Sequence, residues 1–346
     1  MTDIKSLTIK EIEELLLNMG EAKFHGKQIF SWIHKGVSSF DEMTDLSLGL
    51  RMKLSESCIL TNATLKKSLV SSDGETTKLL FEFADGNSIE TVLMKYKHGY
   101  TVCLSTQAGC RMGCVFCAST RRGLARNLTS GEILEQLLFT ERTFCVKITN
   151  IVLMGTGEPL DNFDNVMKFL QLVTDKNGVN IGIRHISLST CGLVDKIYEL
   201  CNRHMGLTLS VSLHAPNDEI RSKIMPINKK WCISELIKAI KKYTEETKRR
   251  VAVEYTLIKN INCSQNDARA LAVLLKGMLV HVNLIPLNPS AECGYECPSK
   301  REIKEFLYIL TSAGISATVR RELGRDINAA CGQLRLTNNG KGEMPV

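Results

Sequence analysis

Residues 101–117 read TVCLSTQAGCRMGCVFC. The first six form an apolar run typical of a buried strand. Cys110, Cys114 and Cys117 follow in a glycine-containing loop with CxxxCxxC spacing. Structural zinc takes four ligands, and no fourth Cys or His lies at a customary short spacing, whereas three cysteines can hold an iron–sulfur cube with one iron left open. The stretch therefore predicts a strand leading into an iron–sulfur loop, with zinc or an accidental spacing as the alternative.

Beyond this stretch, strand-like apolar runs alternate with amphipathic helical segments, which is the pattern of βαβ units around a parallel sheet. The predicted strands span residues 101–106, 150–155, 185–190, 207–214, 251–258, 282–287 and 316–321. The predicted helices include residues 130–140, 162–174, 233–247, 267–276 and 299–312. These roughly six or seven units are fewer than the eight of a closed barrel, so we expect an α/β fold, a partial (β/α)6-type barrel that binds ligands at the carboxyl ends of its strands.

The residues before this barrel show a different pattern. Between residues 6 and 57, apolar side chains recur at helical spacings of three and four. Three β-rich runs follow up to Tyr96, separated by the turn signals Asp73-Gly74 and Asp85-Gly86. We expect helices followed by a β-meander. The predicted divisions are an accessory region over 1–95, the barrel over 96–326 and a C-terminal segment over 327–346.

Composition limits the class of protein. The chain has 346 residues, 44% of them hydrophobic, a net charge of +7 and 13 cysteines, which excludes a disordered tail protein or a collagen. No run approaches the roughly 18 apolar residues that cross a bilayer, and no signal sequence is evident, so we expect a cytoplasmic protein. Because the cytosol keeps thiols reduced, the cysteines indicate metal or thiol chemistry rather than a disulfide scaffold.

Many of the cysteines stand alone in apolar or ordinary surroundings, where a small buried hydrophobe is their usual role. This group consists of Cys58, Cys145, Cys191, Cys201, Cys232 and Cys263. The pair Cys293 and Cys297 is similar to half a metal site, and we interpret it as incidental.

A three-cysteine loop after the first barrel strand resembles the radical S-adenosylmethionine (SAM) superfamily. In that superfamily the open iron chelates the amino and carboxylate groups of the methionine part of SAM, which implies SAM and one [4Fe–4S] cluster here. The second strand ends in Gly155-Thr-Gly157-Glu158-Pro159, similar to the superfamily's Gly-Gly-Glu motif. The resemblance implies that Gly157 and Glu158 meet the methionine ammonium, whereas alone such a turn would usually be a plain loop.

Two further cysteines extend the resemblance to the RlmN and Cfr family of RNA adenosine methyltransferases. Cys103 lies inside the first predicted strand, and Cys331 lies in Ala330-Cys331-Gly-Gln-Leu334, which matches the family's final segment. Without the resemblance, each would more often be a packed thiol. The matching stretches cover essentially the whole chain, at residues 103–127, 157–159, 212–217, 225–230, 283–286 and 329–334.

The family's chemistry implies roles for both thiols. An aromatic C–H carbon of adenine is not nucleophilic enough to attack the SAM methyl group directly, so a radical route is required. The resemblance implies that Cys331 first takes a methyl group from one SAM, and that a deoxyadenosyl radical from a second SAM removes hydrogen from it. The methylene radical adds to adenine, and Cys103 then attacks the Cys331 sulfur, which forms a transient disulfide and releases methylated RNA.

The remaining site residues also follow from the resemblance. Glu90 matches the carboxylate that accepts the ring proton, although a Glu in an alternating strand is otherwise usually solvent-facing. This role would place the meander against the barrel mouth. The implied SAM contacts at strand ends are Ser189, Ser212, Leu213, His214 and Asn288.

The resemblance implies 23S rRNA and tRNA as partners. RNA phosphates are expected near Arg121, Arg122, Arg126 and the arginines between 320 and 325, and the N-terminal helices resemble the family's accessory RNA-binding domain. We further expect an electron donor such as flavodoxin or ferredoxin, a monomer, and no membrane association.

Two alternatives stay open. RlmN-type enzymes methylate adenine C2 in 23S rRNA and in tRNA next to the anticodon, whereas Cfr-type enzymes methylate C8 of the same rRNA adenosine and confer antibiotic resistance. Pro159 matches the RlmN pattern Gly-Glu-Pro, and Thr156, where methionine or isoleucine is more usual, alters only a side chain. The second alternative is a non-catalytic RNA-binding module with a structural iron–sulfur cluster.

Overall fold

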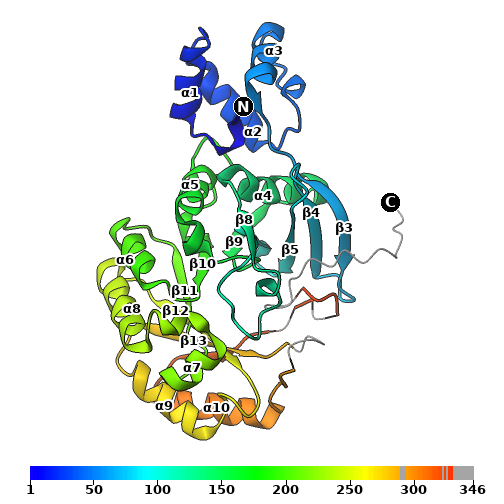
Figure 1. The fold of residues 1–346 in the computed structure, drawn as a ribbon. Helices are drawn as coiled ribbons and strands as arrows, with labels where there is room; N and C mark the ends of the chain where they lie inside the picture. Colours follow the sequence, from blue (N-terminus) through cyan, green and yellow to red (C-terminus); the bar gives the residue numbers. More distant parts are fainter. Residues whose placement is uncertain (289–293, 322, 325, 330–346) are drawn as a thin grey trace.

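The computed structural model describes residues 1–288, 294–321, 323–324 and 326–329. Its centre is a ten-stranded sheet with the strand order β14-β13-β12-β11-β10-β9-β6-β5-β4-β3. The N-terminal helices lie beyond one end of this sheet, at the top of Figure 1. The α/β fold expected from the sequence is confirmed, and among the described residues the two edge strands of the sheet do not pair with each other.

Seven consecutive strands of the sheet are parallel to one another, as expected of βαβ units. They are β6 (Gly99–Cys103), β9 (Ile148–Leu153), β10 (Ile186–Thr190), β11 (Thr208–Ser212), β12 (Val251–Leu257), β13 (Val280–Pro286) and β14 (Ala317–Val319). Each overlaps a predicted strand. The first ends at Cys103 rather than at residue 106, because the chain then turns into a short hairpin that carries the cysteine loop.

The β-meander is part of the same sheet. It consists of β3 (Thr64–Val70), β4 (Thr76–Glu82) and β5 (Ser88–Tyr96), all antiparallel. Strand β5 also pairs with β6 in antiparallel fashion, so hydrogen bonds run from the meander directly into the parallel strands. The division at residue 95 stays a prediction, and the sheet is continuous across it.

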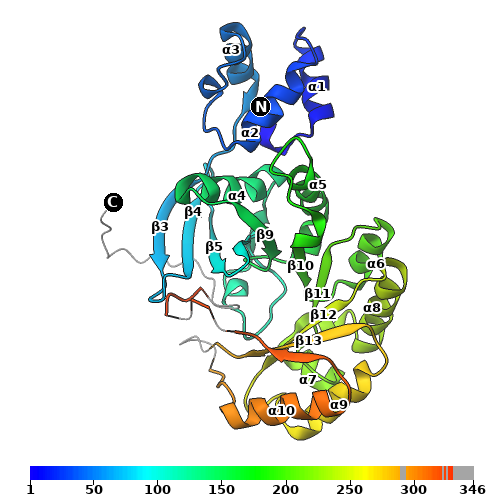
Figure 2. The same ribbon diagram turned by 180° about the vertical axis from the view of Figure 1, so that it is seen from behind.

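Helices follow the parallel strands along the chain and lie along the outside of the sheet (Figures 1 and 2). They are α4 (Ser130–Phe144), α5 (Phe163–Thr174), α6 (Val194–Asn202), α7 (Asp218–Ile224), α8 (Ile233–Thr247), α9 (Gln265–Leu275) and α10 (Lys300–Ser312). Thr129, Ser264 and Ser299 begin three of them with capping boxes, in which the cap oxygen and the third residue's carboxylate satisfy free backbone N–H groups. The sequence did not indicate α6 and α7.

The N-terminal unit contains α1 (Ile9–Asn18), α2 (His25–His34) and α3 (Leu48–Ser57), together with the short parallel pair β1 (Thr2–Asp3) and β2 (Cys58–Ile59). A fully buried ion pair between Lys5 and Glu135 of α4 connects it to the sheet domain. Burial lowers the pKa of Lys5 and raises that of Glu135, while each charge stabilises the other. This contact fixes where the unit joins the rest of the protein.

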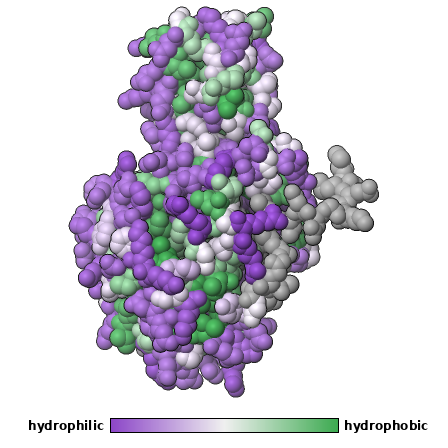
Figure 3. All heavy atoms as spheres, viewed as in Figure 1, coloured by the Kyte–Doolittle hydropathy of each residue, from purple (hydrophilic) through white to green (hydrophobic). Residues whose placement is uncertain are grey.

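One hydrophobic core runs through the N-terminal helices, the sheet and its covering helices. Apolar side chains also reach the surface in the middle of the face shown in Figure 3, between polar margins. Among the described residues, no helix has the length and apolar character that crossing a membrane requires.

Candidate active site

The three loop cysteines lie in a segment closed by a small hairpin. Strand β7 (Gln107–Gly109) pairs antiparallel with β8 (Leu124–Asn127), and the backbone N–H of Cys110 donates to the carbonyl of Gly123 at 2.9 Å. A side chain at Gly109, whose φ is +80°, would place Cβ 2.0 Å from that same carbonyl oxygen, so only glycine fits. The hairpin therefore brings Cys110 to the beginning of a closed loop.

Two of the three loop thiols, Cys110 and Cys114, are buried. Burial raises the pKa of Cys110 to about 12, and Coulombic repulsion from Cys117 adds to this; burial also raises the pKa of Cys114. As thiolates these groups would carry like charges close together, which a bound cation would offset. Among the described residues, no three His, Cys, Asp or Glu side chains are grouped as the ligands of one metal ion, and the assignment of the three cysteines as cluster ligands stays a prediction.

The turn after β9 is held in place by close backbone contacts. A Cβ on Gly155 would lie 2.7 Å from the carbonyl oxygen of Leu104, and one on Gly157, whose φ is +109°, would lie 2.8 Å from the Gln107 backbone nitrogen. Glu158 is buried, and its two oxygens accept backbone N–H groups from Leu160 at 3.0 Å and Cys191 at 2.7 Å. Burial raises the pKa of this carboxyl group. The carboxylate thus joins the ends of β9 and β10.

A pocket opens beside this turn, and its lining contains three of the expected SAM contacts: Gly157, Glu158 and Ser189. Glu254 of β12 also lines it. The Oε2 atom of Glu254 is buried without a hydrogen-bond partner among the described residues, 3.6 Å from Nη1 of Arg320. This oxygen therefore has an ion-pair partner in Arg320 but accepts no hydrogen bond among the described residues, and it can still accept one from a ligand with N–H or O–H donors, such as the ammonium group and ribose hydroxyls of SAM.

The expected contacts after β11 lie close to the cysteine loop. Leu213 and His214 are buried, and His214 packs edge-on against Phe116 of the loop with ring centroids 4.9 Å apart. Nδ1 of His214 accepts the Thr256 backbone N–H at 2.9 Å, and burial lowers the pKa of the imidazole to about 3. The ring is therefore neutral with its proton on Nε2, which makes it a hydrogen-bond donor on that side.

Glu90 is buried in β5 and not solvent-facing. Its carbonyl accepts the hydroxyl of Ser105 at 2.6 Å, and that same hydroxyl accepts the N–H of Thr156 at 2.9 Å. Gln136 of α4 holds the other side of this region, since its amide bonds both backbone groups of Ser105 and the Thr91 hydroxyl. These bonds place the meander against the mouth of the parallel strands, beside the turn at residue 157.

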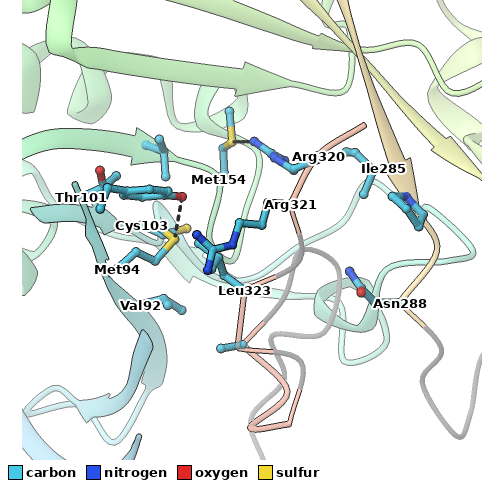
Figure 4. Close-up of a pocket in the computed structure, with 14 residues that line it drawn as sticks. Val92, Met94, Thr101, Cys103, Met154, Ile285, Asn288, Arg320, Arg321 and Leu323 are labelled. Carbon is cyan, nitrogen blue, oxygen red and sulfur yellow. Dashed lines mark hydrogen bonds between the residues drawn. The ribbon is translucent and has the colours of Figure 1, made fainter. Parts of the chain in front are cut away.

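Cys103 lines a second pocket, together with Val92, Met154 and Asn288. Figure 4 shows Cys103 and Asn288 toward opposite ends of it, with Arg320 and Arg321 between them. Cys103 packs with Val92, and Ala329 lies against the same pair. The described part of the C-terminal segment therefore passes Cys103 shortly before position 331. Cys331 itself lies outside the described residues.

The sequence interpretation missed several site residues. Arg221 is completely buried. Its guanidinium donates hydrogen bonds to the carbonyls of Cys191, which follows β10, and Leu213, which follows β11. Cys191, interpreted as an ordinary thiol, donates the N–H that binds Glu158. Nothing in the local sequence distinguishes these residues, because their partners come from distant segments. Cys297 is half-buried in an apolar cluster beside the loop, and Cys293 lies outside the described residues.

Comparison with known proteins agrees with this geometry. Residues 104–269 match the Radical SAM superfamily, and residues 2–60 match the ribosomal RNA large subunit methyltransferase N-terminal domain. A protein of Alkaliphilus oremlandii named "Probable dual-specificity RNA methyltransferase RlmN" is 56% identical over 96% of this chain and 97% of its own length. A protein of the same name from Clostridium novyi is 50% identical over 97% and 98%.

A solved structure shows the same similarity. The crystal structure of a radical SAM methyltransferase from Sphaerobacter thermophilus superimposes with a TM-score of 0.93 at 44% identity, and covers 97% of this chain and 99% of that one. The similarity therefore includes the helical N-terminal unit, the meander and the parallel strands in one arrangement.

Proposed function

The chain belongs to the RlmN family of radical SAM methyltransferases, and we propose that it is a dual-specificity enzyme that methylates C2 of an adenosine in 23S rRNA and in tRNA. The observation that carries the proposal is the placement of Glu90 and Cys103 on adjacent strands, next to the segment that leads to Cys331 and near the cysteine loop. A structural RNA-binding module has no need for this combination.

The family uses one [4Fe–4S] cluster and SAM, which together supply an electron, a methyl group and a hydrogen-abstracting carbon. In our proposal, Cys110, Cys114 and Cys117 hold the cluster. The turn at Gly157 and Glu158 binds the methionine end of SAM, in the pocket that also holds Ser189. The remaining proposed contacts to SAM are Ser212, Leu213, His214 and Asn288.

Three side chains of the protein act on the RNA base. Cys331, as a thiolate, accepts a methyl group from SAM by displacement and later carries the carbon that is bonded to adenine. Glu90 accepts the proton from the ring carbon. Cys103 attacks the sulfur of Cys331, so that an S–S bond forms as the bond between that sulfur and the bridging carbon breaks; the released carbon takes up a proton and becomes the methyl group of the base. The pocket beside Cys103, lined by Val92, Met94 and Met154, is apolar enough to receive a flat base.

The position of methylation and the partners are part of the proposal. The Gly157-Glu158-Pro159 pattern favours C2 over C8. We propose a monomer that acts in the cytoplasm, receives electrons from flavodoxin or ferredoxin, and binds RNA through its N-terminal helices and the arginines around the pocket mouth, such as Arg321.

The test is the fate of RNA in Cys103→Ala protein. Cys331 should still be methylated and bonded to adenine, but no thiol remains to release the product, so the protein should accumulate covalently joined to RNA and lose the extra mass on nuclease treatment. Cys331→Ala should give neither adduct nor product. The matched control is Cys201→Ala, which removes a buried thiol of α6 and should behave like the unaltered protein.

Three results would contradict the proposal. Cys103→Ala protein that carries no RNA and still turns over would remove the disulfide step. Unmodified Cys331 in protein from SAM-replete cells would favour the non-catalytic module. If RNA from a strain without this protein lacks a C8 methyl group on adenosine, rather than a C2 methyl group, the proposed site of methylation is wrong.

A further inference from the structure

The proposed base has a buried cationic neighbour. Nζ of Lys78, on β4, lies 3.0 Å from Oε1 of Glu90, and the two side chains are 9% and 3% exposed. The same Nζ donates to the carbonyl of Asn328 at 3.1 Å. One ammonium group therefore contacts both the proposed base and the segment that leads to Cys331.

The strand register explains how these groups meet. Lys78 pairs with Val92 on β5, and Val92 pairs with Cys103 on β6. Residues directly opposite each other share one face of a sheet, and alternate residues of a strand point the same way. Glu90 therefore lies on the face that also carries Lys78 and Cys103.

The described residues between 320 and 329, called here the C-terminal arm, are attached to the turn before β4 and to the beginning of that strand. Arg321 pairs with Glu75 at 2.7 Å, and Asp326 accepts the backbone N–H of Ser72 at 2.7 Å. Gly324 lies so close to Thr76 that a Cβ there would be 2.8 Å from its methyl carbon. The contact from Lys78 continues this attachment into the protein interior.

Attachment of the arm alone does not require a lysine at this position. Burial of an ammonium and a carboxylate has a large desolvation cost, which only good pairing offsets, and an apolar pair of similar size would pack the sheet at least as well. An ammonium in contact favours the ionised form of a carboxyl group, which is the form that accepts a proton.

We propose that Lys78 is a positioning residue that keeps Glu90 ionised and couples it to the arm that precedes Cys331 in the chain. This inference rests on the proposed function. In the step that it serves, which follows addition of the methylene radical, the C–H bond of the adenine carbon breaks, the proton moves to a Glu90 oxygen, and the electron pair of that bond stays on the ring. The unpaired electron left by the radical addition would pass to a one-electron acceptor, for which the oxidised iron–sulfur cluster of the proposed function would serve.

Other charged or titratable groups share this face or border it. Glu82 pairs with Lys66 at 2.7 Å, and Arg321 pairs with Glu75. Among the described residues, these groups besides Lys78 include Lys66, Lys67, Glu82, Tyr96, Cys103, Arg320 and Arg321.

The experiment follows the covalent protein–RNA adduct in the full-length, cluster-loaded enzyme with Cys331 already methylated. The reaction with RNA, SAM and reductant runs at pH 7, and the adduct is quantified on denaturing gels before and after a jump to pH 9. Lys78→Met should accumulate adduct at pH 7, because the ammonium group that favours the ionised form of Glu90 is gone, and should convert that adduct to product at pH 9, where a higher pH favours ionisation instead. Lys78→Arg should restore turnover at pH 7.

Three controls separate the explanations. Glu90→Gln should keep its adduct at both pH values, and so should Lys78→Met combined with Glu90→Gln, which excludes a simple effect of pH on Cys103. Lys66→Met removes a lysine from the neighbouring ion pair of β3 and should behave like the unaltered enzyme. Asp326→Asn loosens the arm without touching Glu90, and its rate should fall by a similar factor at both pH values.

Each outcome bears on the inference. Normal turnover of Lys78→Met at pH 7 overturns the inference. An accumulated adduct or a loss of activity that persists at pH 9 also overturns it, because a lysine that only attaches the arm would give the same defect at both pH values. If Lys78→Met fails to bind iron or to fold, Lys78→Gln carries the same prediction. A Glu90→Gln enzyme that releases product normally contradicts the proposed function instead.

Discussion

Replacement of Arg221 by methionine should destabilise the protein far more than its position on the short helix α7 indicates. The guanidinium donates hydrogen bonds to Leu213 O, Asn228 Oδ1, Trp231 O, Cys191 O and Ser212 O. Three of these bonds are fully buried. A buried acceptor that loses its donor costs about 1–3 kcal/mol, so the sum is about 3–9 kcal/mol. Removal of the buried charge offsets part of this cost, and we expect Arg221→Met to lower the free energy of unfolding by about 3 kcal/mol.

Urea denaturation of the cluster-free protein measures this cost. The matched control is Lys223→Met on the same helix, because Lys223 pairs with Glu219 in an exposed position and its loss should change the free energy of unfolding by less than about 0.5 kcal/mol. Iron content after reconstitution gives a second measurement. Val115 in the cysteine loop bonds to the carbonyl of Ile224 at the end of α7, so Arg221→Met should also load less iron.

Equal unfolding free energies for the two variants would refute this reasoning. That result would mean that the strand ends after β10 and β11 find other donors or water when the guanidinium is removed. A destabilised Arg221→Met protein with full iron loading would refute only the link between α7 and the cysteine loop.

Three further predictions concern the loop, the turn and acid stability. Alanine at any one of the three loop cysteines should abolish iron loading and methylation, and a full iron load in one such variant, measured by metal analysis, would contradict the cluster assignment. Gly157→Ala should weaken SAM binding at least tenfold in equilibrium dialysis, because the new Cβ would lie 2.8 Å from the Gln107 backbone nitrogen. The control is Gly277→Ala, since Gly277 also has a positive φ of +77° but has open space around it. This control should lose only about 1 kcal/mol of stability and bind SAM normally. Burial lowers the pKa of His34 to about 4, so the unfolded chain takes up this proton first as the pH falls below about 6.5. The free energy of unfolding therefore falls as the pH drops from about 6.5 to about 4. In urea titrations at pH 5, His34→Gln should remove about 2 kcal/mol of this loss. An unchanged dependence of stability on pH in the variant would contradict the prediction.

Long, regular elements could be predicted from the sequence. Strands such as β12 and helices such as α8 are apolar runs with clear periodicity, and their predicted bounds agree with the structure within a residue. The hairpin of β7 and β8 could not be predicted, since its strands are short and its pairing depends on a close approach between Gly109 and Gly123. Helix α7 has only seven residues, too few for a periodic signal.

The same distinction between local patterns and long-range contacts applies to the candidate site. The cysteine loop is a local spacing, so the sequence alone indicates it, and the family membership supports its cluster. The contact of Glu90 with Lys78 depends on the register between β4 and β5, and the bonds of Arg221 depend on two loops that meet in space. No local pattern encodes either of them. The roles of the individual site residues stay predictions.

The hydrogen-bonded pairing of β5 with β6 also affects how this protein could be recombined with relatives. A chimaera joined at residue 95 would take β5 from one parent and β6 from another, and so separate Val92 from the Cys103 with which it pairs. A junction before Thr64 would exchange the helical unit and keep Glu90, Lys78 and Cys103 from one parent. We therefore expect chimaeras of two family members that are joined near residue 60 to stay active and to exchange RNA preference, and chimaeras joined near residue 95 to be inactive.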